Sequence, residues 1–257
     1  MTDQPVVIVT GASGGLGAAV GRCLGEQGAA VVLVARTEGA LTRIAGDIEA
    51  AGGRSLAVGG DVSHWGACAG VVETAMRRFG RIDALVNNAG VVQPLATTAG
   101  ADPALWRRCL EVNLLGPFHM IRAALDALRL RNGRVVNVSS GAATLPLAGA
   151  GAYCATKAAL NHFTRVLAAE EPEVTAVAVR PGVVDTSMQA ELRNQAVGGM
   201  PDDMVAYYRR LKAENRLERP EVPGRAIAWL ALNAPLGWSG RFIDYDDPEI
   251  PTSSPVA

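Results

Sequence analysis

Cysteine and histidine are scarce in this chain, and both are widely scattered. The four cysteines, Cys23, Cys68, Cys109 and Cys154, form no CxxC pair, and the three histidines are equally dispersed along the 257 residues. Disulfide frameworks and zinc sites need these residues in clusters of characteristic spacing. We therefore expect neither a disulfide framework nor a metal site.

The chain also lacks an excess of charge of either sign and any long apolar run. Its 24 Lys and Arg nearly balance 25 Asp and Glu, and no basic stretch is present to attract nucleic acid or an anionic membrane. The opening MTDQPVVIVT has neither the basic nor the long apolar segment of a signal peptide, and no later run is long enough to span a membrane. These features predict a cytoplasmic protein whose partner is a small molecule, not a nucleic acid or a membrane.

What is present is a regular alternation of short β-branched runs with longer segments of helical periodicity. The runs predict strands at residues 5–10, 30–36, 54–62, 82–88, 133–140, 174–182 and 239–245. The segments between them predict helices at residues 15–27, 38–51, 64–79, 103–130, 153–170 and 221–233. Strands this apolar on both faces need helices on either side. We predict an α/β fold with a single Rossmann-type, doubly wound parallel β-sheet.

No composition shift divides the chain, so we expect one domain over residues 1–247. Residues 200–217 open with proline and two acids before apolar residues at helical spacing, which predicts an extra helix. Together with the turn that precedes it, this helix would form a lid over about residues 185–217. Residues 248–257 are rich in proline and serine and are expected to be a loosely ordered tail.

A glycine-rich turn, TGASGGLG, follows the first predicted strand and precedes a helix. Glycine permits positive φ and lets a pyrophosphate approach the backbone at a helix N-terminus, where free N–H groups and the helix dipole favour negative charge. This turn predicts a dinucleotide site made by Gly11, Ser13, Gly15, Leu16 and Gly17.

The same turn matches the GxSxG pattern of a hydrolase nucleophile elbow around Ser13. A hydrolase would also need an acid and a histidine on loops above the strand ends. His64, His119 and His162 all fall inside predicted helices. The dinucleotide interpretation is therefore favoured.

The second predicted strand ends in Ala35-Arg36-Thr37, where an NAD-binding fold usually carries an acid for the ribose 2′-hydroxyl. Arg36 supplies a planar cation instead, which attracts a 2′-phosphate. We therefore predict NADP(H) as the cofactor, bound at its 2′-phosphate by Arg36 and Thr37.

Tyr153 and Lys157 lie one helical turn apart in YCATK. Hydride transfer to a carbonyl makes an alkoxide that needs a proton, and a phenol can supply one if its anion is stabilised. A neighbouring ammonium, together with the oxidised nicotinamide, should lower the tyrosine pKa. Ser140 ends a predicted strand, where its hydroxyl could hold the substrate carbonyl, and Asn113 inside a long helix suggests a kink or a water relay to Lys157.

From Val6 to about Asp247 the chain resembles the short-chain dehydrogenase/reductase family. TGASGGLG, NNAG, Asn113, Ser140, Tyr153, Lys157 and PG occur in the order and spacing of that family. The resemblance implies that Tyr153 is the general acid/base and that Lys157 lowers its pKa and binds the nicotinamide ribose. It also implies that Ser140 orients the substrate and that Asn113 supports a proton relay.

The resemblance implies further cofactor contacts along the chain. It assigns the adenine to Asp61 and Val62, the adenosine ribose to Asn88, Ala89 and Gly90, and the nicotinamide end to Pro181, Gly182, Val184 and Thr186. The chain departs from the family in one respect. Members that prefer NADP often carry a basic residue before the second glycine of the turn, where this chain has Gly14.

Within the family, PGVVDTSMQ and the segments after it resemble the sepiapterin reductase and benzil reductase branch, which reduces one carbonyl of a vicinal dicarbonyl. This resemblance implies that Asp185 anchors the substrate ring; the residues alone also allow Asp185 to cap the following helix. Met188 is a further expected substrate contact. An apolar wall is expected from Leu145, Leu147, Met188, Tyr207 and Tyr208.

The leading hypothesis is an NADPH-dependent carbonyl reductase acting on vicinal diketones or aromatic ketones. A secondary-alcohol or steroid dehydrogenase remains an alternative, because the chemistry is reversible and the sequence does not set its direction. A non-catalytic NADP(H) sensor is a third. The family resemblance implies a homodimer, with a tetramer as the alternative, through the helices that begin near Pro103 and Tyr153.

Overall fold

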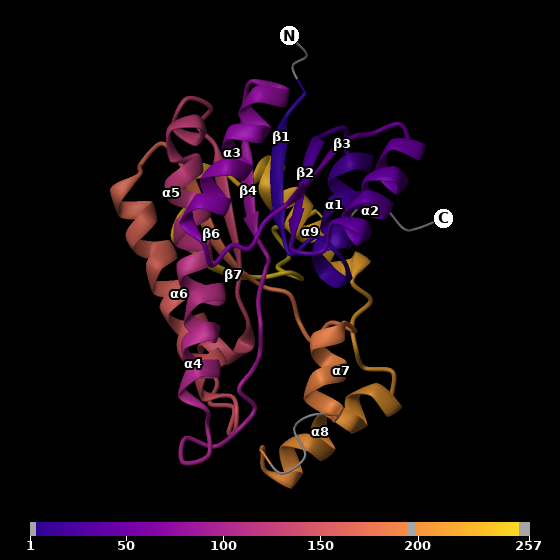
Figure 1. Ribbon diagram of the computed structural model, residues 1–257, viewed down its shortest axis with the longest axis vertical. Helices are drawn as coiled ribbons and strands as arrows, with labels where there is room; N and C mark the ends of the chain where they lie inside the picture. The colour runs from indigo at the N-terminus through magenta and orange to yellow at the C-terminus, as the bar shows by residue number, and fades with distance from the viewer. Residues whose placement is uncertain (1–3, 195–198, 252–257) are drawn as a thin grey trace.

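The computed structural model describes residues 4–194 and 199–251, which form a parallel β-sheet between two layers of helices (Figure 1). In this part of the chain seven strands pair in the order β3-β2-β1-β4-β5-β6-β7, and every pair is parallel. The strands are β1 (Val6–Thr10), β2 (Ala30–Ala35), β3 (Arg54–Gly59), β4 (Ala84–Asn87), β5 (Arg134–Val138), β6 (Thr175–Arg180) and β7 (Phe242–Asp244). The predicted α/β fold with one doubly wound sheet is confirmed.

Two groups of helices cover the two faces of the sheet. The helices are α1 (Gly15–Glu26), α2 (Glu38–Ala50), α3 (Trp65–Phe79), α4 (Pro103–Leu110), α5 (Gly116–Arg129), α6 (Gly151–Glu170), α7 (Ser187–Asn194), α8 (Asp202–Ala213) and α9 (Glu221–Asn233). One core cluster joins the sheet to α1, α2 and α9, and a second joins it to α3, α5 and α6. Every residue of β1, β2 and β4 is buried, which explains their unbroken apolar sequences. Within the described residues, no helix is both long and apolar enough to cross a membrane.

The helix predicted at residues 103–130 is not uniform. A π-helical segment, Glu111–Leu115, separates α4 from α5, and Asn113 lies fully buried at its centre. Both polar atoms of the Asn113 side chain bind the backbone of Val91, each at 2.8 Å. These two side-chain bonds to Val91 accompany the departure from α-helix geometry, at the residue where the sequence suggested a kink. Such π segments are frequent at functional sites.

The third predicted strand is shorter than expected. β3 ends at Gly59, because Gly60 N–H binds the Ala35 carbonyl and Asp61 turns back to accept a hydrogen bond from Ser63 N–H at 3.0 Å. Asp61 and Val62 thus leave the sheet at its carboxyl edge.

The segment between β6 and α9 stands apart from the helical layers. In Figure 1, α7 and α8 lie below the carboxyl ends of the strands, away from the N-terminus. α8 falls within the helix predicted at 200–217, and α7 is the helix that directly follows Asp185 and Thr186. A third core cluster holds the two helices together and to the loop after β4, with Val92, Leu192, Met200 and Tyr208 among its buried members.

The tail is ordered further than its composition indicated. Ile250 is only 2% exposed and packs into the core cluster on the α1 side of the sheet, with its N–H bound to the Asp247 carbonyl. Ile250 thus holds this part of the predicted tail, residues 248–251, against the core. Residues 252–257 lie outside the described residues.

Candidate active site

A cavity of about 870 Å³ opens along the carboxyl ends of the strands. Its walls come from the glycine-rich turn after β1, the ends of β2, β4, β5 and β6, and helices α6, α7 and α8. The strand order reverses between β1 and β4, and open parallel sheets bind their ligands at such a switch point. The cavity has the size expected for a bound cofactor with a small substrate.

The glycine-rich turn is built for close approach of its own backbone. Gly11 has φ of +66°, and a Cβ on Gly17 would overlap the Gly11 carbonyl and the Asn88 side chain. Asn88 in turn donates from Nδ2 to the Thr10 carbonyl at 2.9 Å, which ties β4 to the turn. No side chain caps α1, and Gly14 to Gly17 line the cavity. Uncapped N–H groups at a helix N-terminus facing a cavity fit the pyrophosphate of a dinucleotide.

One end of the cavity presents a free cation. Arg36 follows β2, is exposed, and makes no ion pair with any residue in the described ranges. Thr37 lies beside it on the cavity wall. This end therefore offers an available guanidinium to an anionic group.

Asp61 lies on the same wall and is held by Arg108, a residue that the sequence did not suggest. Arg108 donates to Asp61 at 2.7 Å and to Ser63 Oγ at 2.6 Å. Burial raises the pKa of Asp61, but the hydrogen bonds from Ser63 and Arg108 outweigh it and lower the pKa to about 2. Arg108 comes from α4, 47 residues along the chain, so sequence spacing carried no signal for this contact.

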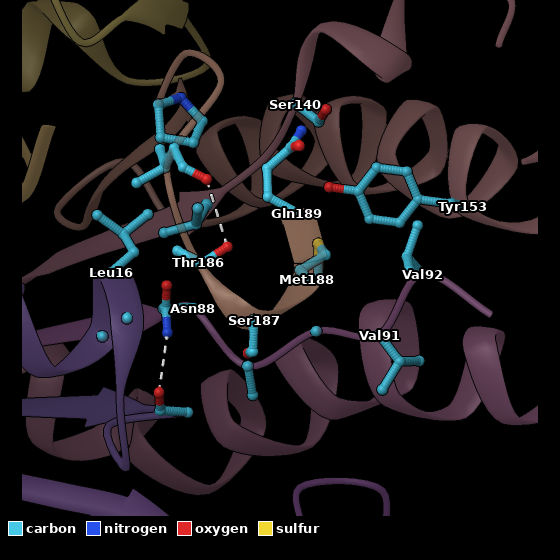
Figure 2. A pocket seen from close by; sticks show the side chains of 18 of the residues that line it. Leu16, Asn88, Val91, Val92, Ser140, Tyr153, Thr186, Ser187, Met188 and Gln189 are labelled. Atoms are coloured by element: carbon cyan, nitrogen blue, oxygen red, sulfur yellow. Dashed lines mark hydrogen bonds between the residues drawn. The ribbon is translucent and has the colours of Figure 1, made fainter. Parts of the chain in front are cut away.

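The other end of the cavity brings Ser140 and Tyr153 (Figure 2) together with Lys157. Ser140 follows β5, and its Oγ accepts from Ala142 N–H at 3.1 Å, which fixes the start of a single 3-10 turn. Tyr153 and Lys157 lie in α6, with Lys157 Nζ 5.7 Å from the centroid of the Tyr153 ring. Lys157 Nζ also donates to the Val138 carbonyl at 2.7 Å, so the ammonium is anchored to the end of β5.

The titration behaviour of this pair differs from the sequence-based expectation. Burial raises the pKa of Tyr153 to about 12, although the hydrogen bond with Ser140 acts to lower it. Burial likewise lowers the pKa of Lys157 to about 8. Desolvation disfavours the charged form of each group and is the largest cause of both shifts. The expected lowering of the tyrosine pKa is therefore not present in the chain by itself.

Asn113 does not line the cavity. Besides its bonds to Val91, its Nδ2 lies 3.2 Å from Thr156 Oγ1, which itself donates to the Tyr153 carbonyl at 2.8 Å. The structure thus connects Asn113 to the helix that carries Tyr153 and Lys157, through Thr156. The relay from Asn113 to Lys157 stays a prediction; the Lys157 ammonium itself binds the Val138 carbonyl.

The predicted apolar wall is assembled as expected. Leu145, Leu147, Met188, Tyr207 and Tyr208 all line the cavity, although they come from three separate segments. Two further lining residues of α7, Gln189 and Leu192, were not singled out from the sequence. Both belong to the short helix that follows Asp185.

Asp185 does not line the cavity and has a different partner from either one expected. Its Oδ2 accepts from Lys212 Nζ of α8 at 2.5 Å, and its backbone N–H binds the Glu218 carbonyl. α7 begins at Ser187, and among the described residues no N–H of its first turn bonds the Asp185 side chain. In the structure Asp185 thus forms an ion pair with Lys212, and the substrate-anchor and helix-cap roles stay predictions. Sequence could not reveal this ion pair, because Lys212 lies 27 residues away.

Every other site residue predicted from the sequence, apart from Asn113, lines this one cavity. They are Gly11, Ser13, Gly15, Leu16, Gly17, Arg36, Thr37, Asp61, Val62, Asn88, Ala89, Gly90, Ser140, Tyr153, Lys157, Pro181, Gly182, Val184, Thr186 and Met188.

Comparison with known proteins identifies the family of this chain. The short chain dehydrogenase model matches residues 5–197, which is most of the chain. The chain belongs to the short-chain dehydrogenase/reductase family. Among solved structures, that of the short chain dehydrogenase/reductase YIR035C from Saccharomyces cerevisiae matches with a TM-score of 0.92 and 35% identity, covering 98% of this chain and 100% of that one.

Two curated relatives carry named activities. Benzil reductase ((S)-benzoin forming) IRC24 of Saccharomyces cerevisiae is 32% identical over 94% of this chain and 96% of its own. The cis-4-hydroxycyclohexanecarboxylate dehydrogenase of Sinomonas cyclohexanicum is 38% identical over 90% of each chain. This short-chain dehydrogenase/reductase is therefore an NAD(P)-dependent oxidoreductase that acts on alcohols or carbonyls.

The rival hydrolase constellation is not assembled in this short-chain dehydrogenase/reductase. No histidine is among the residues that line the cavity, and His119 Nδ1 lies 3.1 Å from the Val62 carbonyl, on α5. The cysteines at 23, 68, 109 and 154 are free thiols. Across residues 4–194 and 199–251, no three His, Cys, Asp or Glu side chains lie close enough to hold a metal ion.

Proposed function

We propose that the protein is an NADPH-dependent carbonyl reductase that transfers hydride to one carbonyl of a vicinal diketone or an aromatic ketone. The observation that carries this proposal is the meeting of Tyr153, Ser140 and Lys157 at one end of a cavity whose other end is the glycine-rich turn. A proton donor and a dinucleotide cradle in one cavity are the two requirements of carbonyl reduction by hydride transfer.

Arg36 supports NADPH over NADH. It is exposed at the cavity end of β2, where Ala35 supplies no carboxylate for a ribose 2′-hydroxyl, and it has no ion-pair partner among the described residues. A guanidinium in this place attracts a 2′-phosphate and can bind it with two parallel hydrogen bonds. Bound NADPH would supply the hydride.

Tyr153 and Ser140 are proposed to receive the substrate carbonyl oxygen. Both hydroxyls face the same cavity, so both can donate to one oxygen as negative charge develops on it. Tyr153 then gives its proton to the alkoxide, and Ser140 keeps the substrate in register with the phenol.

Lys157 is proposed to stabilise the tyrosinate that this proton transfer leaves behind. Its ammonium lies over the Tyr153 ring and is fixed by the Val138 carbonyl, so it needs no rearrangement when the phenolate forms. A second positive charge near the phenol, contributed by the oxidised nicotinamide, would add to this effect. Together these charges oppose the burial that raises the tyrosine pKa to about 12 in the chain by itself.

Asn113 is proposed as a positioning residue. It acts on Tyr153 through Thr156, whose hydroxyl bonds the Tyr153 carbonyl. The remaining cavity residues named in the family resemblance, from Asp61 and Val62 to Val184 and Thr186, are proposed to hold the cofactor along its length.

The substrate class rests on the wall opposite the phenol. Leu145, Leu147, Met188, Tyr207 and Tyr208 provide apolar and aromatic surface for an aryl group. Similarity to a benzil reductase along nearly the whole chain favours an aryl diketone within that class.

A panel assay tests the proposal. Purified protein is incubated with NADPH and with benzil, other 1,2-diketones, aromatic monoketones and pterins, and NADPH oxidation is followed by absorbance. We expect benzil or a related diketone to give the highest kcat/KM. Failure of every carbonyl compound to oxidise NADPH would contradict the proposal.

A secondary-alcohol dehydrogenase is the second candidate. The Sinomonas relative, whose name describes oxidation of a ring alcohol, favours it. The same residues serve this reaction in reverse, with Tyr153 as general base. Assays of cyclic secondary alcohols with NADP⁺ and NAD⁺ distinguish the two candidates, because a higher kcat/KM for an alcohol than for any diketone would favour the dehydrogenase.

A further inference from the structure

Gln189 is a buried amide in the substrate end of the cavity that the proposed hydride transfer does not use. It lies in α7, is only 5% exposed, and lines the cavity with Ser140 and Tyr153. Figure 2 shows its side chain, the Ser140 hydroxyl and the Tyr153 hydroxyl turned toward the same part of the cavity. Amide side chains are seldom buried, and when they are, their polar atoms have hydrogen-bond partners. The partners of both ends of the Gln189 amide therefore have to be identified.

The orientation of the amide is fixed by Arg193. One helical turn along α7, Arg193 donates from Nη1 to Gln189 Oε1 at 3.2 Å. A guanidinium has donors only, so the oxygen of the amide must face it and the NH₂ group is presented to the other side. Among the described residues no hydrogen bond joins Gln189 Nε2 to an acceptor, and this nitrogen is not one of the fully buried polar atoms that lack a partner, so it is open to the cavity.

Apolar side chains share the cavity wall with the amide. Met188 and Leu192 lie on α7 with Gln189, and Leu145 and Leu147 line the same cavity. An oriented donor in such a wall selects ligands that carry an acceptor at the matching place, because a ligand without one leaves the NH₂ group unsatisfied. The reacting carbonyl oxygen of the substrate already receives two donors, the hydroxyls of Tyr153 and Ser140, one for each lone pair. The acceptor that meets the Gln189 amide is therefore a second group of the substrate.

We propose that Gln189 is a specificity-determining residue whose Nε2 donates a hydrogen bond to the second carbonyl oxygen of a vicinal diketone. The first oxygen lies at Tyr153 and Ser140, and the adjacent carbonyl presents its oxygen to the amide. This inference rests on the proposed carbonyl reductase function and names the feature of the substrate that the site recognises.

The test compares benzil with deoxybenzoin, in which one carbonyl of benzil is replaced by a methylene group. Three variants are used: Gln189→Met, which keeps the size of the side chain without its donors; Gln189→Glu, which leaves an acceptor only; and Glu191→Gln, a control on the same helix at a residue that does not line the cavity. For each protein, kcat/KM with NADPH and the Kd of each compound for the NADP⁺ complex are measured, and thermal unfolding checks the fold.

We expect Gln189→Met and Gln189→Glu to lower kcat/KM and to weaken binding for benzil by about 3- to 10-fold, the effect of one buried hydrogen bond. The values for deoxybenzoin should stay unchanged, and Glu191→Gln should leave both compounds unaffected. Equal losses for the two compounds, or no loss for benzil, would overturn the role of Gln189.

The two readouts separate this inference from the function on which it rests. If the wild-type protein binds benzil but does not reduce it, and Gln189→Met weakens only benzil binding, the proposed reaction fails and the recognition stands. If the wild-type complex binds benzil no better than deoxybenzoin, and Gln189→Met changes neither Kd, the recognition fails whatever the turnover.

Discussion

Replacing Arg36 by aspartate should reverse the cofactor preference. The guanidinium of Arg36 has no ion-pair partner among the described residues. Binding a 2′-phosphate therefore breaks no ion pair, and the whole contact contributes to the affinity for NADPH. A charge-assisted hydrogen bond contributes about 1.5–3 kcal/mol, or roughly 10- to 100-fold in affinity. Because Arg36 is exposed, solvent screening points to the lower end of that range.

The aspartate also introduces two effects of its own. It repels the 2′-phosphate of NADPH, and it accepts a hydrogen bond from the ribose 2′-hydroxyl of NADH. We therefore expect the ratio of kcat/KM for NADPH to that for NADH, measured with benzil, to fall by at least about 10-fold in Arg36→Asp. Raised ionic strength should lower the wild-type ratio and change the ratio of the variant much less.

A matched control carries the same change of charge away from the cavity. Arg43 is an exposed residue of α2 that does not line the cavity, so Arg43→Asp should leave the ratio unchanged. An unchanged ratio in Arg36→Asp would refute the assignment of the 2′-phosphate to Arg36. An equal fall of the ratio in both variants would show that the preference depends on the net charge of the protein and not on a specific contact of Arg36.

Two further predictions concern the ion pairs of the site. Asp185→Asn and Lys212→Met should lower the free energy of unfolding by similar small amounts, about 1 kcal/mol or less, because the pair is exposed, and should leave pterin and benzil binding unchanged; loss of pterin affinity in Asp185→Asn alone would restore the anchor hypothesis. Asp61 has a pKa of about 2 in the folded chain, below its ordinary value of 3.8, so its contribution to stability is complete above about pH 4 and is lost as the pH falls towards 2. Urea unfolding across this range should show a loss that is larger in the wild type than in Asp61→Asn by about 1–2 kcal/mol after solvent screening, and equal slopes in the two proteins would contradict it.

The strands and the catalytic end were predictable because each depends on a local feature. Unbroken apolar runs mark strands buried on both faces, and all seven predicted strands are present in the described residues. In a parallel sheet the carboxyl ends of all strands meet at one edge. A serine after β5 and a tyrosine early in α6 therefore had to come together, and Ser140 and Tyr153 do.

Side-chain partners distant in the chain were not predictable. The ion pair between Asp185 and Lys212 and the contact of Arg108 with Asp61 depend on how α8 and α4 pack, which periodicity does not specify. Gln189 lies in a helix of eight residues with too few apolar positions to signal its period. The charge of Lys157 beside Tyr153 could be seen in the sequence, whereas the burial that raises the pKa of Tyr153 and lowers that of Lys157 in the chain by itself could not.

The proposed carbonyl reduction depends most on Tyr153 as the proton donor. Tyr153→Phe removes one hydroxyl and keeps the ring beneath Lys157, so NADPH binding, measured by titration, should be largely retained. The variant should lose about 10²- to 10⁴-fold in kcat/KM for benzil, the usual contribution of a general acid. A Tyr153→Phe protein that keeps most of the wild-type kcat/KM would contradict the central claim.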